Sequence, residues 1–209
     1  MELNPVLQID RLTFEYASHP LLRQFSLRLG AGITWLRGEN GAGKTTLLKL
    51  AGGALTPHGG TLRLDELEIH AQPLAYRLRC HYCGGDTPPL PWLTVREILD
   101  LHLALYPATD AALLDAELRA FHLLPTLDQP VTTLSLGQHK KMQLSLALAL
   151  PVRLLLIDEP FNGLDVDAVA YLRQQLSAPA RLARQCIVLT SHLDPMLPLA
   201  HTVVLSPPL

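Results

Sequence analysis

The chain has 209 residues, with 17 Lys and Arg against 19 Asp and Glu, a net charge of −2 and 48% apolar residues. This length gives a prior of one or two domains, and the apolar content excludes disorder. A near-neutral balance without a Lys/Arg block argues against a nucleic-acid partner. The long apolar run from Met142 to Val152 falls well short of the roughly 20 residues that cross a bilayer. No secretory signal is visible at the start of the chain, so we expect a cytoplasmic location.

The predicted elements alternate between strands and helices after an antiparallel start. Residues 7–29 show β-type alternation around a turn at 17–20, which predicts an antiparallel β flank. A strand, a glycine-rich turn and a helix then follow over residues 33–51. This order predicts an α/β fold with a wound, mainly parallel sheet, whose ligands bind at the carboxyl ends of the strands. Further strands are expected within 59–65, 79–82, 154–157, 186–190 and 202–205, and helices at 94–124, 137–150 and 167–176.

The glycine-rich turn has the spacing of a P-loop, which is glycine, four residues, glycine, lysine and Ser/Thr. Glycines allow successive backbone N–H groups to surround an anion, and the helix N-terminus adds positive charge behind them. A purely structural turn with an incidental lysine is the alternative, but it does not account for the strand before the motif and the helix after the motif. The candidate phosphate-binding residues are Gly38, Asn40, Gly41, Gly43, Lys44, Thr45 and Thr46, with the Thr45 hydroxyl as a ligand of Mg²⁺.

Two adjacent acids, Asp158 and Glu159, end an apolar strand. Buried strands seldom end in paired carboxylates without a cation, because an unpaired interior charge is costly to desolvate. Asp158 is therefore a candidate Mg²⁺ partner, and Glu159 a candidate general base for a water aligned with the γ-phosphate. A solvated strand end before Pro160 is the alternative.

Between these motifs lies Leu134-Ser135-Leu136-Gly137-Gln138. With it the sequence resembles the ATP-binding subunits of ABC transporters over nearly the whole chain. In that family the signature motif has glycine where this chain has Leu136. Ser135 is a good helix N-cap, and the helix after it would present free N–H groups to a phosphate. The resemblance implies that Ser135, Gly137 and Gln138 contact the ATP of a second, head-to-tail subunit.

The resemblance assigns further residues in the same order along the chain. Tyr16 matches an aromatic ring that stacks on adenine, although a strand tyrosine packed on the sheet is the alternative. Gly163-Leu164-Asp165 matches the D-loop, which touches the opposite subunit. His192 matches the switch histidine, which holds the attacking water together with Glu159. Lys44, Glu159 and His192 are thus the candidate catalytic residues.

One family position departs from the pattern. A glutamine that reaches Mg²⁺ is expected before the helical segment, but the position falls on Gly85 or, with a shift of one, on Asp86. Asp86 could ligate Mg²⁺ directly, whereas Gly85 would leave the contact absent.

Three other features have simpler interpretations. The Cys80-x-x-Cys83 pair lacks the second ligand pair of a zinc site, so we expect buried strand cysteines. Lys140 and Lys141 are expected on the solvated face of the signature helix. The apolar loop around Trp92 is either a surface turn or part of a groove for a membrane subunit.

The resemblance implies a P-loop NTPase that hydrolyses ATP with Mg²⁺ as a dimer, with itself or with a second ATPase chain. It would drive a separate transmembrane permease subunit and lie at the inner face of the membrane through that partner. Residues 1–209 would form one ABC-type ATPase domain, with a helical subdomain at about 94–150 inserted in a RecA-like core. The length and motifs are similar to compact export ATPases, among them that of the haem exporter of cytochrome c maturation. A soluble ABC-type ATPase and a weakly hydrolysing scaffold are the alternatives.

Overall fold

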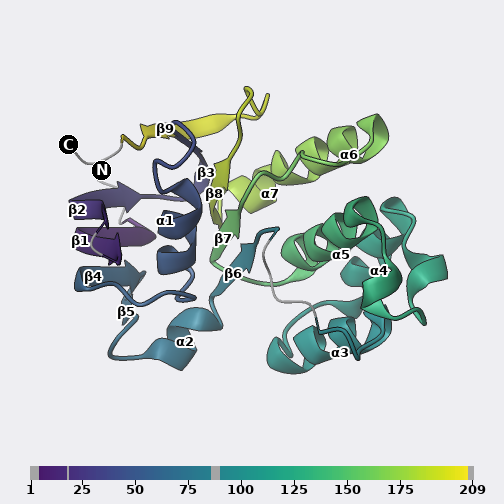
Figure 1. Cartoon of the computed structure of the whole chain (residues 1–209). Helices are drawn as coiled ribbons and strands as arrows, with labels where there is room; N and C mark the ends of the chain where they lie inside the picture. Colours follow the sequence, from purple (N-terminus) through teal and green to yellow (C-terminus); the bar gives the residue numbers. More distant parts are fainter. Residues whose placement is uncertain (1–4, 18, 86–89, 207–209) are drawn as a thin grey trace.

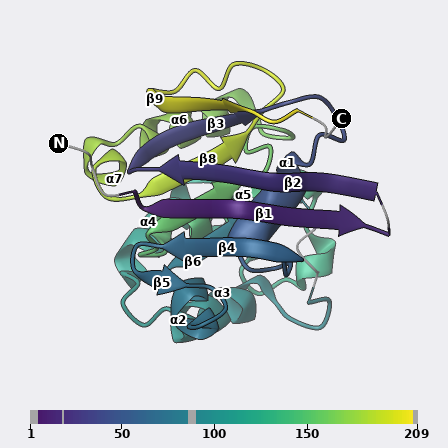
Figure 2. The ribbon, with the colours of Figure 1, turned by 90° about the vertical axis from the view of Figure 1, so that its left-hand side faces the viewer.

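Two β-sheets lie on either side of helix α1 (Figure 1). The computed structural model describes residues 5–17, 19–85 and 90–206. One sheet is antiparallel in the order β2-β1-β4-β5, seen face-on in Figure 2, and the other is parallel in the order β6-β7-β8-β3-β9. This arrangement confirms the predicted α/β fold with an antiparallel flank. The strands are β1 Leu7–Tyr16, β2 His19–Leu29, β3 Gly32–Arg37, β4 Gly59–Leu64, β5 Leu67–Glu68, β6 Cys80–Cys83, β7 Leu154–Ile157, β8 Cys186–Thr190 and β9 Leu199–Val204.

The helices form the remaining layers. α3, α4 and α5 lie together beyond the β6 edge of the parallel sheet (Figure 1). In the part of the chain that the structure describes, no helix combines the length and the hydropathy needed to cross a bilayer. The helices are α1 Lys44–Ala51, α2 Pro73–Arg77, α3 Val95–Leu105, α4 Ala111–Ala120, α5 Leu136–Ala149, α6 Val166–Leu176 and α7 Pro179–Leu182, with 3₁₀ turns η1 Leu124–Thr126 and η2 Val131–Thr133.

The inner strand β7 is apolar throughout because both of its faces are covered. Side chains alternate along a strand, so Leu154 and Leu156 pack into the core shared with α1 and the antiparallel sheet. Leu155 and Ile157 pack into the second core, which contains the helical segments. Such two-sided burial is typical of parallel sheets.

The strand register decides where the functional side chains meet. Because β3, β6, β7 and β8 run parallel, their carboxyl ends share one edge of the sheet. Ile157 pairs with Leu189, and Leu36 pairs with Thr190. The residue after Ile157 therefore lies beside Thr190 and close to the loop that follows β3.

The helical prediction over 94–124 is only partly right. The structure breaks this segment into α3 and α4, separated by residues 106–110. Pro107 lies in the break, where proline would remove a helical hydrogen bond, and the Asp110 side chain caps α4 by accepting from the backbone N–H of Ala112 at 2.9 Å. The apolar periodicity continues across the break, which is why the two helices resemble one.

Five short elements were not predicted. These are the two-residue strand β5, the 3₁₀ turns η1 and η2, and the helices α2 and α7, both of which begin with a proline. Elements of two to five residues are too short to show a hydrophobic period. The expected turn at 17–20 is also shorter than predicted, because β2 begins at His19 and Pro20 pairs with Glu15.

Candidate active site

The glycine-rich loop after β3 closes around the side chain of Lys44. Its ammonium donates to the carbonyl oxygens of Gly38 and Glu39, at 2.8 and 2.9 Å. Gly41 and Gly43 have φ angles of 81° and 96°, a region that glycine adopts without steric cost. Gly43 is the N-cap of α1, so free N–H groups and the positive end of the helix dipole face the loop. The loop therefore has the form of an anion cradle that contains an ammonium group.

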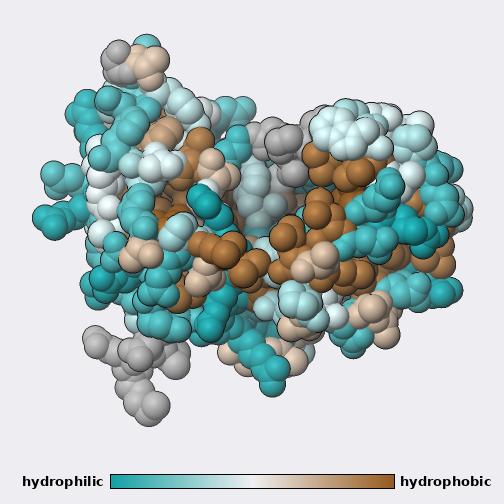
Figure 3. All heavy atoms as spheres, turned by 90° about the horizontal axis from the view of Figure 1, so that it is seen from below, coloured by the Kyte–Doolittle hydropathy of each residue, from teal (hydrophilic) through white to brown (hydrophobic). Residues whose placement is uncertain are grey.

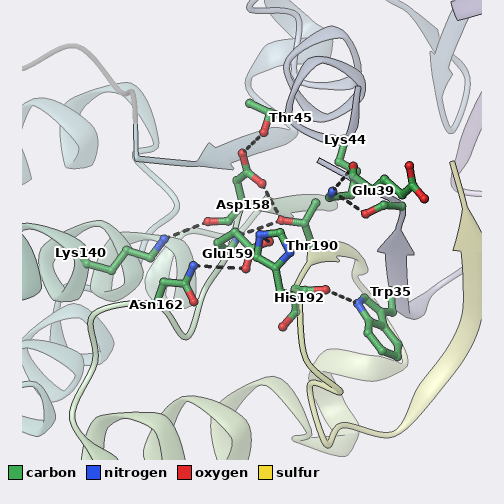
Figure 4. Close-up of polar contacts among 12 residues, drawn as sticks. Trp35, Glu39, Lys44, Thr45, Lys140, Asp158, Glu159, Asn162, Thr190 and His192 are labelled. Atoms are coloured by element: carbon green, nitrogen blue, oxygen red, sulfur yellow. Dashed lines mark hydrogen bonds and ion pairs between the residues drawn. The ribbon is translucent and has the colours of Figure 1, made fainter. Parts of the chain in front are cut away.

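Asp158 follows β7 and accepts a hydroxyl hydrogen bond on each carboxylate oxygen (Figure 4). Thr45 donates to Oδ2 and Thr190 donates to Oδ1, each over 2.5 Å. The Thr190 hydroxyl also accepts from the backbone N–H of Glu159, at 2.9 Å. Thr190 thus orients both acids, although sequence reasoning did not single it out, because a threonine inside a buried strand carries no signal of its own.

The residues at this point fit a magnesium ion. Thr45 and Asp158 place a hydroxyl and a carboxylate side by side, and both are hard oxygen donors of the kind that Mg²⁺ prefers. Within the described ranges no cluster of three or more His, Cys, Asp or Glu could hold a metal, and Mg²⁺ in such sites takes much of its coordination from phosphate and water. Asp86, the third candidate ligand, lies outside the described residues, and Gly85 is exposed.

Glu159 and His192 face each other (Figure 4). Glu159 Oε1 is 3.5 Å from His192 Nε2, and the Asn162 amide donates to Glu159 Oε2 at 3.4 Å. The loop that carries His192 is held by the indole N–H of Trp35, which donates to the carbonyl oxygen of Ser191 at 3.1 Å. A carboxylate beside an imidazole is suited to accept a proton from water.

These side chains share one cleft of about 470 Å³, a volume within the range of ligand pockets. Tyr16 enters it from β1 with 49% of its surface exposed, and its hydroxyl lies 3.4 Å from Thr46 Oγ1. An exposed ring of this kind can stack on a base. The lining residues are Tyr16, Leu21, Asn40, Gly41, Gly43, Lys44, Thr45, Thr46, Asp158, Glu159 and His192.

Ser135, Gly137 and Gln138 do not line this cleft. They form the start of α5, where the Ser135 hydroxyl accepts from the backbone N–H of Gln138 at 3.2 Å and the Gln138 side chain accepts from that of Ser135 at 2.9 Å. Leu136, between them, is 92% exposed. The helix start is therefore well formed but lies outside the cleft of its own chain.

The interpretation of Lys140 and Lys141 as a solvated face is wrong. Lys140 donates to the carbonyl oxygen of Asp158 at 2.9 Å, and Lys141 contacts Asp165 Oδ2 at 2.5 Å. Both partners are far along the chain, so the pattern of α5 alone could not reveal them.

The cysteine prediction is confirmed. Cys80, Cys83 and Cys186 are buried and free. Burial raises the pKa of Cys80 and of Cys186 to about 12 in each case, so both thiols stay protonated at neutral pH, and it is the thiolate that binds metals.

A phosphate cradle after β3, with a carboxylate and a candidate base after β7 at the same edge of the parallel sheet, defines a P-loop nucleoside triphosphatase. The protein-family model that matches the chain is "ABC transporter", over residues 22–162. The chain therefore belongs to the ATP-binding subunits of the ABC transporter family, and its activity is ATP hydrolysis.

Curated relatives of the chain cover most of its length. It is 34% identical over 192 residues to the cytochrome c biogenesis ATP-binding export protein CcmA of Legionella pneumophila, covering 90% of this chain and 94% of that protein. The protein of the same name from Rhodospirillum rubrum is 35% identical over 181 residues, covering 86% of this chain and 77% of that one.

Solved structures agree with this family. An ATP-binding subunit of an ABC transporter superposes with a TM-score of 0.81 at 29% identity, covering 90% of this chain and 80% of that one. A putative ABC transporter ATP-binding protein from Pyrococcus furiosus shares the fold, with a TM-score of 0.74 at 20% identity, covering 95% and 96% of the two chains.

Proposed function

We propose that this chain hydrolyses ATP between two head-to-tail ATPase subunits and so drives transport through a separate transmembrane permease. The proposal rests on one observation: in a single chain, the residues expected to contact nucleotide lie in two separate places. The cradle, the acids and His192 share a cleft, whereas the capped and exposed start of α5 lies outside it. Such a helix start can bind a phosphate only on another molecule. A second chain, identical or not, would supply it.

In this proposal the charged and hydroxyl groups that meet the triphosphate have distinct chemical tasks. Lys44 and the loop amides bind the β- and γ-phosphates. Thr45 and Asp158 hold Mg²⁺, which neutralises phosphate charge. Glu159 accepts a proton from the water whose oxygen attacks the γ-phosphorus, while the bond from that phosphorus to the bridging oxygen breaks and ADP leaves. His192 positions this water and the γ-phosphate from the other side.

Exposed leucines on α2 and α3 support a membrane partner. The face seen in Figure 3 carries hydrophobic side chains across both helices, and Leu74, Leu101 and Leu105 are 71%, 42% and 52% exposed. Large apolar patches mark interaction sites. The permease would cover this face and hold residues 1–209, as one ATPase domain with the helical subdomain at 94–150, at the cytoplasmic surface of the membrane.

The relatives suggest the transport process. Both proteins named above are export ATPases of cytochrome c biogenesis and match most of this chain. We therefore propose an export step of that kind. Membrane fractionation in which the chain copurifies with a multi-span protein separates this function from that of a soluble ABC-type ATPase.

The substitution Glu159→Gln tests the hydrolytic mechanism. It removes the base but keeps the size and the hydrogen bond to Asn162, so ATP turnover should fall by about 10²–10⁴ while ATP still binds. Turnover is measured as phosphate release, and binding by titration with ATP. Glu66→Gln, at an exposed glutamate, is the matched control and should change neither quantity. Full turnover by the Glu159→Gln variant would remove Glu159 from the role of base.

A further inference from the structure

Two adjacent lysines in α5 hold the two ends of the segment from Asp158 to Asp165. The Lys140 ammonium donates to the carbonyl oxygen of Asp158 at 2.9 Å, and Figure 4 shows its side chain extending from α5 toward that residue. The Lys141 ammonium lies 2.5 Å from Asp165 Oδ2, with only 15% of its side chain exposed. Neighbouring helical side chains diverge by about 100°, so the pair can reach both ends of one segment.

The start of α5 packs against the middle of the same segment. A Cβ atom added to Gly137 would lie 3.1 Å from the carbonyl oxygen of Gly163, so the two backbones are nearly in contact. The hydrogen bond from Lys141 lowers the pKa of Asp165 to about 2. The Asp165 carboxylate is therefore charged throughout the neutral range, and this ion pair persists there.

The segment from Asp158 to Asp165, which the two lysines hold, contains the candidate base. Glu159 and Asn162 lie between the two lysine contacts, and the Glu159 backbone has a φ of 49°, a conformation that non-glycine residues rarely adopt without outside support. Thr190 supports it from β8, and Lys140 supports it from α5. The position of Glu159 thus depends on a helix whose N-terminus is Ser135.

We propose that Lys140 and Lys141 are positioning residues that fix α5 and the 158–165 segment as one unit, so that engagement of Ser135 by the partner's nucleotide aligns Glu159 of the same chain. This inference rests on the head-to-tail arrangement proposed above. ATP bound in one cleft then aligns Glu159 at the other cleft, through contacts that lie entirely within the chain whose Ser135 it engages. Neither lysine lines the cleft of its own chain.

The test replaces Lys141 by methionine, which keeps the apolar stem and removes the charge. In the full chain copurified with its membrane partner, Lys141→Met should lower kcat by about tenfold, the effect of losing a charged hydrogen bond. KM for ATP, the ATP Kd of the chain alone and the melting temperature should stay close to those of the wild type. Asp165→Asn, which keeps a helix-capping oxygen, should reproduce the loss, and Lys141→Arg should restore turnover.

A double-mutant cycle with Ser135→Ala tests the coupling. If α5 and the segment act as one unit, the losses in kcat from Ser135→Ala and Lys141→Met should be strongly non-additive. Arg119→Met, which removes an ion pair of 2.7 Å on α4, is the control and should leave kcat unchanged. An unchanged kcat for Lys141→Met, additive losses, or a loss of kcat explained by a lowered melting temperature would each overturn the proposal. Failure of the proposed function itself differs, because the wild type would then neither associate into dimers with ATP nor copurify with a multi-span membrane protein.

Discussion

The buried hydroxyl of Thr190 sets the geometry of both acids at the end of β7, Asp158 and Glu159. It donates to Asp158 Oδ1 and accepts from the backbone N–H of Glu159. Its exposed surface is 0%, so water cannot replace either bond. An unsatisfied buried polar group costs about 1–3 kcal/mol, and here two groups would lose their partner together.

We therefore expect Thr190→Val to lower kcat by about tenfold or more. Valine keeps the shape and the strand preference of threonine but lacks the hydroxyl. Binding of ATP without metal should be unchanged, because the Lys44 loop is untouched. Steady-state turnover and titration with ATP in the presence of a chelator measure the two quantities.

Thr126→Val is the matched control for this substitution. Thr126 is 5% exposed and donates to the carbonyl oxygen of Leu123 at 2.7 Å, far along the chain from the acids. Both variants should lose some stability, but only Thr190→Val should lose turnover. Equal losses of turnover would mean that the Thr190 hydroxyl has no special part in placing the acids.

The contact between α4 and α6 contains a buried carboxyl group. Glu117 on α4 is 1% exposed, and the Tyr171 hydroxyl on α6 donates to its Oε2 at 2.9 Å. Burial raises the pKa of Glu117 above its ordinary value near 4.5, although the Tyr171 hydrogen bond and the Arg181 charge oppose this. The stability that this contact between α4 and α6 gives the fold therefore depends on pH.

The sign of this linkage follows from the raised pKa. Below about pH 4.5 the Glu117 carboxyl is protonated in both the folded and the unfolded chain, and its contribution to the free energy of unfolding is fully present. Above that pH the unfolded chain loses the proton first, so stability falls as pH rises through the folded-state pKa, by at most about 1.4 kcal/mol per pH unit. Glu117→Gln, which cannot ionise, should lack this decrease.

Urea unfolding of the wild type and of Glu117→Gln between pH 4 and pH 8 measures the difference, in which the other titrating groups cancel. Glu97→Gln gives a control of opposite sign, because hydrogen bonds from Thr94 lower the pKa of Glu97. Wild-type stability relative to Glu97→Gln should rise with pH. A difference for Glu117→Gln that does not vary with pH would contradict the prediction.

Across the whole molecule, the nucleotide cleft and the start of α5 lie apart, and this separation predicts the mode of assembly. Leu136 is 92% exposed at the first turn of α5. Nothing in the described part of the chain packs over this leucine. A partner chain that places its triphosphate against α5 would cover it.

Leu136→Asp should prevent ATP-dependent dimerisation without unfolding the chain. A carboxylate in the first turn suits the helix dipole, so the stability of the single chain should be kept, but the added charge would repel the partner's triphosphate. The substitution is made in the Glu159→Gln background, which retains ATP. Light scattering with and without ATP measures the association.

Leu136→Gly in the same background is the control, and it should still dimerise. ATP binding to the single chain should be equal in both variants, since Leu136 does not line the cleft. Full dimerisation of the Leu136→Asp variant would contradict the head-to-tail arrangement.

The P-loop and the acidic strand end could be predicted because their chemistry is contiguous along the chain. Gly38 to Thr46 form one turn of backbone around an anion site, and the residue types alone specify it. The capping box of Ser135 and Gln138 is local in the same way, and the structure has it. The break between α3 and α4 was missed because a hydrophobic period continued across Pro107.

The contacts that organise the site join residues that lie far apart in the sequence. Thr190 meets Asp158 across 32 positions, through the parallel register of β7 and β8. Lys140 and Lys141 meet their partners across 18 and 24 positions, through the direction in which α5 packs on the sheet. Strand register and helix orientation are settled by burial of the whole core, so no short stretch of residues carries them. Short stretches of the sequence thus predict which chemical groups the site contains, and the packing of the whole fold determines which of these groups are in contact.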